Sequence, residues 1–370
     1  MKKTAPKILF SAYAFYPEFG GLEQQIYLLS QEYLKMGYQV DVLTEKTAPD
    51  LLDFEDIDGI NVYRMPYFAK RTAFSYLALL FHLLSFQVRK GREYQLVILR
   101  AALTYYPLIF GLGKFLRLIR GNTFVTADTG GDQDEIIIVK NWPLYKLMIF
   151  FFNQHNILNS VCEANYQHYL ELGFSTKKLT KIGNGTDTSN YKKSTYPKKV
   201  KNFLFLARLV KLKGIYETIE AFQIIIQSHP SVRLYIGGDG PELQSILDLI
   251  HKKSLAQNII YVGKVTPEKK DSFFSLGECL IQPSYSEGFG LVYIEAAVRK
   301  KVIIATDVAD LKKIFGRQIF FCEKKNVENI VETVQKVLET KKFALNYDAI
   351  VSQFEIQKTA KEILKASNIH

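Results

Sequence analysis

The stretch from residue 279 to residue 310 reads CLIQPSYSEGFGLVYIEAAVRKKVIIATDVAD and decides the fold class of this chain. It predicts an apolar strand at 279–282, a polar loop at 283–290, a helix at 291–298 and a second apolar strand at 302–305. Units of strand, loop, helix and strand are typical of α/β domains. We therefore expect the chain to form doubly wound α/β sheets.

Two acidic residues flank the glycines of this stretch. Glu287 lies in the predicted loop, and Glu295 lies in the predicted helix. Gly288 and Gly290 allow the backbone to approach a ligand and leave N–H groups at a helix N-terminus, where an anion is stabilised. The pattern predicts a cradle for a diphosphate between two acceptors of hydroxyl groups. Alternatively, Glu287 caps the helix and Glu295 is a solvated helix residue.

The same alternation runs along the whole chain of 370 residues. We predict strands at 7–10, 39–44, 96–99, 123–127 and 157–161, and again at 203–206, 232–236 and 259–262. Residues 51–67 are expected to be irregular and to end in an edge strand at 60–64. An acidic, glycine-rich loop, 128–135, follows one predicted strand, at the position where open α/β sheets bind ligands. Gly20 and Gly21 precede a helix at 22–36, as phosphate binding or a tight turn would each require.

The length and the polar, lysine-rich segment 188–201 predict two α/β domains that face one another across a cleft. We place an N-terminal domain at 1–190, a second domain at 191–345 and a last segment at 346–370. Arg208 follows one predicted strand of the second domain, and Lys213 precedes the next helix. Two such cations suit a diphosphate, although two solvated loop cations would give the same pattern.

Composition limits the classes of partner. The formal net charge is +11, and from 59 to 127 the chain has ten basic residues but only one acid, Glu93. Residues 73–88, AFSYLALLFHLLSFQV, are uncharged but too few to span a bilayer, so they predict a core helix or an interfacial helix on an anionic membrane. No motif for reading nucleic acid is present, so we expect no nucleic-acid partner.

The three cysteines are far apart in the sequence and show no metal-binding spacing. They suggest buried thiols in a reducing compartment. The start, MKKTAPKILFSAYAF, lacks a cleavage pattern and predicts a buried first strand instead of a signal peptide. We expect a cytoplasmic protein, with a peripheral position on the inner face of the membrane as an option.

Six motifs in order resemble the retaining glycosyltransferases of family GT4: PEFGGLE at 17–23, NGTD at 184–187, ARLVKLKG at 207–214, GGDGPEL at 237–243, VGKV at 262–265 and SEGFGLVYIEA at 286–296. The resemblance covers nearly the whole chain. It implies the GT-B fold, in which the C-terminal domain holds a nucleotide-sugar donor, UDP- or GDP-linked, and the N-terminal domain holds most of the acceptor. The segment 354–365 resembles the helix that returns to the N-terminal domain.

The resemblance also implies roles for individual residues. Glu295 would hold the ribose, Glu287 the donor sugar, and Arg208 and Lys213 the departing diphosphate. The backbone near Val265 would contact the base, and Gly20 and Gly21 would lie against the phosphates. The backbone of Gly288, Phe289, Gly290 and Leu291 would contact the sugar and the phosphate. The resemblance also implies that the reaction requires no metal, no cofactor besides the donor and no side-chain nucleophile. The acceptor would be a hydroxyl of a glycan or of a lipid-linked molecule, as in bacterial surface polysaccharide synthesis.

The sequence departs from the family pattern at three places. Asp128 stands about where many relatives have a histidine, and the loop DTGGD resembles that of another subgroup, so Asp128 is a candidate catalytic residue. Lys300 and Val302 replace a glycine and a proline, and Ala309-Asp310 replaces a Gly-Gly pair. Lys300 and Ala309-Asp310 leave open the alternative that the chain is a non-catalytic protein, which binds a nucleotide or glycan and supports another transferase.

Overall fold

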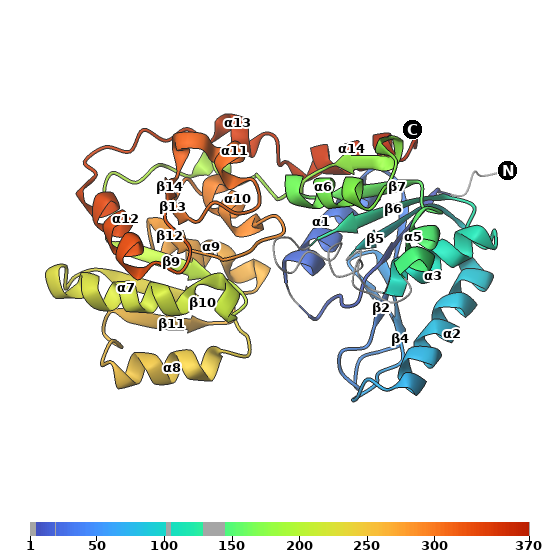
Figure 1. The fold of residues 1–370 in the computed structure, drawn as a ribbon, viewed down its shortest axis with the longest axis horizontal. Coiled ribbons are helices and arrows are strands. Elements are labelled where there is room, and N and C mark those ends of the chain that lie inside the picture. Colours follow the sequence, from blue (N-terminus) through green and yellow to red (C-terminus); the bar gives the residue numbers. More distant parts are fainter. Residues whose placement is uncertain (1–4, 19, 101–104, 129–144, 370) are drawn as a thin grey trace. The chain divides into compact units, whose positions relative to one another are not determined.

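The computed structural model describes residues 5–18, 20–100, 105–128 and 145–369, and these residues divide into two compact units (Figure 1). The first unit contains residues 1–185 and 356–370, and the second contains residues 186–355. Thr186 pairs with Glu355 in a parallel bridge, and the backbone N–H of Thr186 donates to the carbonyl of Phe354 at 2.8 Å. The chain therefore enters and leaves the second unit at one place, whereas the sequence analysis placed the divisions at 190 and 345.

The first unit is built on an eight-stranded sheet in the order β3-β4-β2-β1-β5-β6-β7-β8. Its strands are β1 (Lys7–Ser11), β2 (Gln39–Glu45), β3 (Phe54–Ile57), β4 (Ile60–Met65), β5 (Tyr94–Arg100), β6 (Asn122–Ala127), β7 (Ile157–Ser160) and β8 (Leu179–Lys181). All neighbours are parallel except β3 and β4.

One expectation for this sheet is wrong. Residues 51–67 are not irregular throughout, because β3 pairs with β4 in a hairpin and β4 is not the edge strand. Asp58 and Gly59 both have positive φ, 52° and 85°, as the tight turn of a two-residue hairpin requires. The Phe54 and Tyr63 rings pack 5.0 Å apart across the pair.

Helices cover both faces of this sheet. On one face lie α1 (Gly21–Lys35) and α14 (Ile356–Ala366), which share an apolar cluster with the strands and pack on each other. On the other face lie α2 (Ala73–Lys90), α3 (Tyr105–Phe115), α5 (Tyr145–Phe152) and α6 (Glu163–Glu171). Successive side chains of a strand point to opposite faces, and accordingly Ile8 and Phe10 face α1 whereas Leu9 faces α2.

The second unit has a six-stranded parallel sheet in the order β11-β10-β9-β12-β13-β14. Its strands are β9 (Asn202–Leu206), β10 (Arg233–Gly237), β11 (Ile259–Gly263), β12 (Cys279–Gln282), β13 (Val302–Ala305) and β14 (Phe320–Phe321). Its helices are α7 (Ile215–Ser228), α8 (Leu243–Lys252), α9 (Lys270–Ser275), α10 (Leu291–Val298), α11 (Leu311–Phe315), α12 (Val327–Glu339) and α13 (Asp348–Val351).

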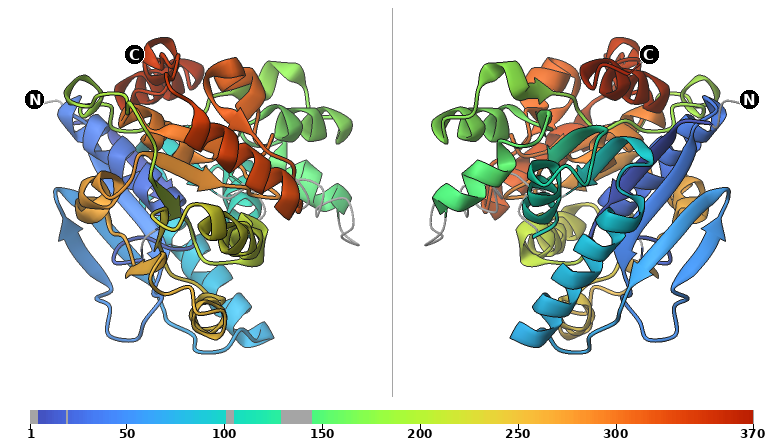
Figure 2. Two further views of the ribbon diagram at one scale, coloured as in Figure 1. Left: turned by 90° about the vertical axis from the view of Figure 1, so that its left-hand side faces the viewer. Right: turned by 90° about the vertical axis from the view of Figure 1, so that its right-hand side faces the viewer.

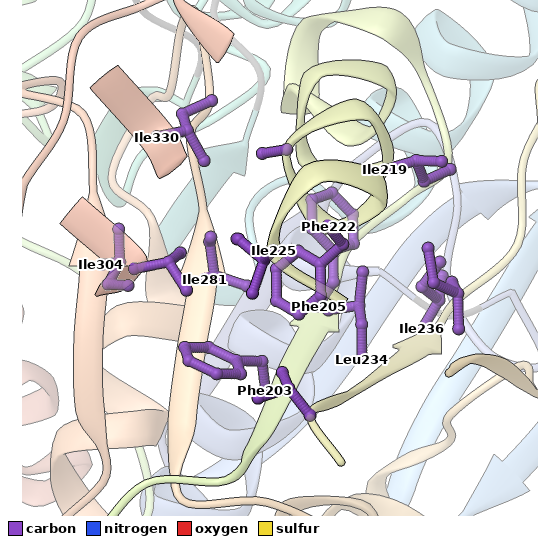
Figure 3. Packing of buried hydrophobic residues seen from close by; sticks show 14 of the residues in the cluster. Phe203, Phe205, Ile219, Phe222, Ile225, Leu234, Ile236, Ile281, Ile304 and Ile330 are labelled. Carbon is purple, nitrogen blue, oxygen red and sulfur yellow. The ribbon is translucent and has the colours of Figure 1, made fainter. Parts of the chain in front are cut away.

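The main core of the second unit lies between α7 and the sheet. Figure 3 shows Phe222 and Ile225 of α7 above Phe203 and Phe205 of β9, with Ile281 of β12 beside them. All five side chains are fully buried. The strands of this unit are apolar without alternation because helices cover the sheet, which is the pattern expected for parallel sheets. This rigid layer holds the loops at the carboxyl ends of the strands.

Candidate functional site

In the second sheet, the direction in which successive strands are added reverses at β9. From β9 the chain builds outward through β10 and β11, and it then continues on the other side of β9 with β12, β13 and β14. Ligands of open α/β sheets bind outside the carboxyl ends of the strands at such a switch point. The loops after β9 and β12 meet there, and the backbone N–H of Tyr285 donates to the carbonyl of Leu212 at 2.8 Å.

A buried ion pair joins these two loops. The Nζ of Lys213, in a short 3₁₀ turn after β9, lies 2.7 Å from Oε2 of Glu287, and the Glu287 side chain is only 8% exposed. The other carboxylate oxygen, Oε1, accepts hydrogen bonds from Ser284 Oγ at 2.8 Å and Gln282 Nε2 at 3.1 Å. These three partners fix the carboxylate in one orientation, as a ligand-binding group requires.

The sequence analysis missed Ser284 and Gln282. Their signal is present in the sequence, because a polar glutamine ends the otherwise apolar strand and a serine is the second residue of the loop that follows. Arg208 lies in the loop after β9 and is exposed, and no ion pair of its guanidinium is found with the described residues. Its side chain is therefore available to an anion.

Glycines let the backbones of these loops touch. Gly214 has φ +73°, and a Cβ there would lie 2.3 Å from the carbonyl oxygen of Pro283. At the end of β10, a Cβ on Gly238 would lie 1.9 Å from the carbonyl oxygen of Ala207. Real side chains do not fit at such distances, so the glycines of ARLVKLKG and GGDGPEL are required by packing.

The N-terminus of α10 follows the same loop. Gly290 is its N-cap with φ +75°, and a Cβ there would lie 2.6 Å from the ring of Tyr293. Phe289 is buried against Phe354, with ring centroids 5.4 Å apart, and Gly288 and Leu291 are partly buried on either side. Val265 follows β11 and lies beside the end of β10, because a Cβ on Gly237 would lie 2.6 Å from its Cγ2.

Glu295 is not a solvated helix residue. It lies in α10, is 4% exposed, and its Oε1 accepts a hydrogen bond from Lys270 Nζ of α9 at 2.5 Å. Burying a carboxylate is costly unless it is paired, and Lys270 supplies the opposite charge. No sequence signal marks Lys270, because it lies 25 residues from Glu295 in a run of charged residues.

The predicted residues of the first unit lie at the carboxyl ends of its strands. Gly20 is the N-cap of α1 and Gly21 its first residue. A Cβ on Gly20 would lie 2.7 Å from Oε2 of Glu23, a first-turn acid. Burial raises the pKa of the Glu23 carboxyl, and the charges of Glu18 and Asp128 act in the same direction, whereas hydrogen bonds from backbone N–H groups lower it. The carboxylate of Glu23 therefore lies at the N-terminus of α1, where the family resemblance implies contact with the donor phosphates.

Asp128 directly follows β6 and pairs with a buried arginine. Nη2 of Arg100, the last residue of β5, contacts Oδ1 of Asp128 and also donates to Asn184 Oδ1 at 2.9 Å. Arg100 is 2% exposed, and a charge at the end of an apolar strand is its signal in the sequence. The rest of the predicted loop, 129–135, lies outside the described residues.

The other two departures from the family pattern, at Lys300 and at Ala309-Asp310, share one backbone feature. Lys300, Ala309 and Asp310 all have positive φ, 53°, 49° and 61°, a region in which glycine is the least strained residue. The ammonium of Lys300 lies 4.5 Å from the ring centre of Tyr191 and 5.4 Å from that of Tyr196. These cation–π contacts hold the Lys300 side chain against the two tyrosine rings. Lys300 therefore is not a member of the Lys213–Glu287 pair.

Metal sites, membrane-spanning helices and cysteines can also be examined in the described residues. Within the described ranges, no group of three or more His, Cys, Asp or Glu side chains is arranged to hold a metal ion. None of the helices that the structure describes is long and apolar enough to cross a membrane. Cys162, Cys279 and Cys322 are buried free thiols, as predicted.

Family models match both units. The model described as "Glycosyl transferases group 1" matches residues 187–354, and the model described as "Glycosyltransferase Family 4" matches residues 19–190. The chain belongs to the GT4 family of GT-B glycosyltransferases. The resemblance and the fold predicted from the sequence motifs are thereby confirmed.

Individual relatives of this glycosyltransferase are distant but similar over most of its length. The gpi3 subunit of the phosphatidylinositol N-acetylglucosaminyltransferase of Schizosaccharomyces pombe is 25% identical, over 88% of this chain and 71% of the relative. Alpha-monoglucosyldiacylglycerol synthase of Streptococcus pneumoniae is 21% identical, over 83% and 72%. The crystal structure of Anabaena HepE in complex with UDP and glucose matches with a TM-score of 0.75 at 17% identity, over 98% of this chain and 99% of that one.

Proposed function

We propose that this glycosyltransferase moves a hexose or related sugar, with retention of anomeric configuration and without a metal ion, from a UDP- or GDP-sugar to a hydroxyl group. The acceptor is a glycan or a lipid-linked molecule of bacterial surface polysaccharide synthesis. The protein acts in the cytoplasm, at the inner face of the membrane. No cofactor besides the donor and no nucleic acid takes part.

The observation that carries this proposal is the Lys213–Glu287 pair at the switch point of the second sheet. The carboxylate is held by fixed partners and accepts hydrogen bonds, as recognition of sugar hydroxyls requires. Lys213 and the exposed Arg208 supply positive charge in the adjacent loop. Glu295, buried further along in α10, would accept from the ribose hydroxyls, with Lys270 holding it in place.

The course of the reaction is taken from the family resemblance, and the charges of the site are consistent with it. The bond between the anomeric carbon and the diphosphate oxygen breaks, and the acceptor oxygen bonds to the same carbon. The acceptor proton passes to the departing phosphate oxygen, on the same face of the sugar. Arg208 and Lys213 stabilise the negative charge that develops on the diphosphate. Asp128 would act on the acceptor side, with Arg100 fixing its orientation.

Relatives support a lipid-linked acceptor. The name of one contains phosphatidylinositol and that of another contains diacylglycerol. The first unit of this chain also has the excess of basic residues described above. Its surface is therefore suited to an acceptor presented by an anionic membrane.

Nucleotide release from a panel of UDP-, GDP- and ADP-sugars, with and without a bacterial lipid extract, tests the proposal. We expect one donor to be used, and Lys213→Ala or Glu287→Gln to lower turnover about 100-fold. Lys211→Ala is the matched control, because Lys211 is an exposed cation in the same 3₁₀ turn. Its turnover should stay within about twofold of the original protein's.

The alternative is a protein that binds a nucleotide or glycan without turnover and supports another transferase. The positive φ angles at Ala309 and Asp310 favour it, since they show strain where the family pattern has glycine. If no donor is turned over but a nucleotide raises the melting temperature, the alternative is correct. Equal turnover in Lys213→Ala and Lys211→Ala would disprove the site assignment.

A further inference from the structure

One helical layer of the first unit has an apolar outer surface. Helices α2, α3 and α5 pack side by side on one face of the first sheet, and their inner side chains join the same core cluster. In the right-hand view of Figure 2, α2 is the light-blue helix at the front. The outward side of this layer is what we call the α2–α3–α5 face.

Exposed apolar side chains gather on this face. Among the described residues, ten of the seventeen exposed large apolar side chains lie on these three helices or directly after α3. The face consists of Phe74, Leu77, Phe81 and Val88 of α2, Phe115 and Leu116 at the end of α3, and Leu147 and Phe150 of α5. The other two exposed residues, Tyr76 and Tyr145, lie nearer the buried sides of their helices. Such concentration marks an interaction site, whereas single exposed apolar residues are ordinary.

The residues of α2 form a stripe. Phe74, Leu77, Phe81 and Val88 are 73%, 64%, 70% and 64% exposed, and their spacing places them on one side of the helix. Leu79, Leu83 and Phe86 on the opposite side are buried in the core. The helix is therefore apolar on both sides, although among the described residues the protein core covers one side and leaves the other exposed.

This exposure belongs to a well-defined helix. Thr72 and Ser75 form a capping box at its N-terminus, with the Ser75 N–H donating to Thr72 Oγ1 at 3.2 Å and the Thr72 N–H donating to Ser75 Oγ at 2.9 Å. The exposed pair Phe115 and Phe150 is also fixed, with ring centroids 5.6 Å apart in an edge-to-face contact. The apolar side chains thus lie on regular helices with defined caps and ring contacts.

Cations border the apolar surface. Lys70 precedes α2, Arg89 and Arg92 lie at its end, Arg117 follows Leu116, and Lys146 lies on α5. All five are exposed, and none forms an ion pair within the part of the chain that the structure describes. Glu93, the single acid between 59 and 127, is paired with Lys7 at 2.7 Å.

We propose that the α2–α3–α5 face binds the surface of an anionic lipid bilayer, with α2 lying flat. The phenylalanine and leucine side chains enter the boundary between headgroups and acyl chains, and the surrounding cations contact lipid phosphates. The inference rests on the proposed function only in that the bilayer would carry the acceptor. Binding itself needs neither donor nor turnover.

A second copy of the chain is a poorer occupant. A symmetric dimer through this face would bring the cation-bordered surfaces of the two copies together. The like charges would oppose association, whereas the phosphates of an anionic bilayer attract them. The net charge of +11 acts in the same direction.

Flotation of the full chain with vesicles tests the proposal. The probes are vesicles of phosphatidylcholine alone and vesicles with about one third phosphatidylglycerol, at low and high salt. We expect binding to the anionic vesicles, weakened by salt, and at least about tenfold weaker binding by the triple variant Phe74→Ser, Leu77→Ser, Phe81→Ser. The variant Arg89→Gln, Arg92→Gln should reduce the preference for anionic lipid.

The matched control is the triple variant Leu52→Ser, Ile224→Ser, Leu276→Ser, which removes three exposed apolar side chains that lie on none of these helices. It should bind vesicles like the original protein, and both triple variants should keep their melting temperature and nucleotide release in solution. Failure of the original protein to bind anionic vesicles would overturn the proposal. So would equal binding by the two triple variants, or a dimer in sedimentation velocity that only the α2 variant abolishes.

Discussion

At the scale of the residue, the functional side chains are held by charge partners. Glu287, Glu295 and Asp128 are each paired with a cation, at Lys213, Lys270 and Arg100. Removing one partner of a buried pair leaves an uncompensated charge, so these cations also stabilise the fold. A loss of activity in their variants must therefore be compared with the melting temperature.

His155 gives a prediction of pH dependence. Its ring is fully buried, Nε2 lies 2.8 Å from the carbonyl oxygen of Pro107, and no partner of Nδ1 is found among the described residues. Burial lowers the pKa of His155 from 6.5 to about 4. Below pH 6.5, His155 is therefore protonated in the unfolded chain but stays neutral in the folded chain. As the pH drops from 6.5 towards 4, the free energy of unfolding should fall by up to about 3 kcal/mol.

Urea unfolding at several values between pH 7.5 and 4 measures this effect. We expect His155→Gln to flatten the loss of stability over that interval, because the glutamine does not titrate. His251→Gln is the control, since His251 is exposed on α8 and its replacement should leave the slope unchanged. Parallel curves for the original protein and His155→Gln would show the prediction to be wrong.

At the scale of the element, α14 completes the first unit from the far end of the chain. Its buried side chains Ile356, Ala360, Ile363 and Leu364 pack in the cluster of α1, and the Tyr33 hydroxyl donates to the carbonyl of Ala360 at 3.3 Å. The sequence analysis placed a returning helix at 354–365. The structure has α14 at Ile356–Ala366.

Ile363 is the residue of α14 on which this packing can be tested. Ile363 is 2% exposed, so Ile363→Ala should lower the free energy of unfolding by about 3 kcal/mol. Lys361→Ala, at an exposed position two residues earlier, should change it by less than about 0.5 kcal/mol. Hydrogen exchange should then show faster exchange in residues 5–185 and unchanged protection in 186–355. Uniform loss of protection in both units would contradict the assignment of α14 to the first unit.

At the scale of the whole molecule, the second unit is a compact body with a hydrophobic core of its own. Its two ends meet at the bridge between Thr186 and Glu355, and its core is formed by its own helices and strands. Domains whose termini lie together can often be excised. The candidate donor residues Arg208, Lys213, Glu287 and Glu295 all belong to this unit.

We therefore expect the fragment 186–355 to fold and to bind a nucleoside diphosphate without the first unit. Thermal unfolding should be cooperative, and UDP or GDP at about 100 times its dissociation constant should stabilise the fragment by about 2.7 kcal/mol. The same fragment with Lys213→Ala should fold but gain much less from the nucleotide. A fragment that folds and gains nothing from either nucleotide would contradict the placement of the donor site.

The sequence by itself determined the α/β class, most strands and the glycine-rich loops. Those features depend on contiguous residues: apolar runs for buried strands, and glycines where φ is positive, as at Gly214 and Gly290. The β3–β4 hairpin was also readable, from Asp58-Gly59, but its half-exposed strand lacks a continuous apolar run. Periodicity alone therefore missed it.

Only the tertiary structure decided which distant residues meet. Lys213 and Glu287 are 74 residues apart, and they are neighbours because β12 pairs with β9 after the chain has already built β10 and β11 on its other side. The pairing of Lys270 with Glu295 and of Arg100 with Asp128 likewise depends on which elements lie next to one another. Local sequence carries the propensity of each element, whereas strand order and register arise from the packing of the whole sheet, and these place the charges of the candidate site.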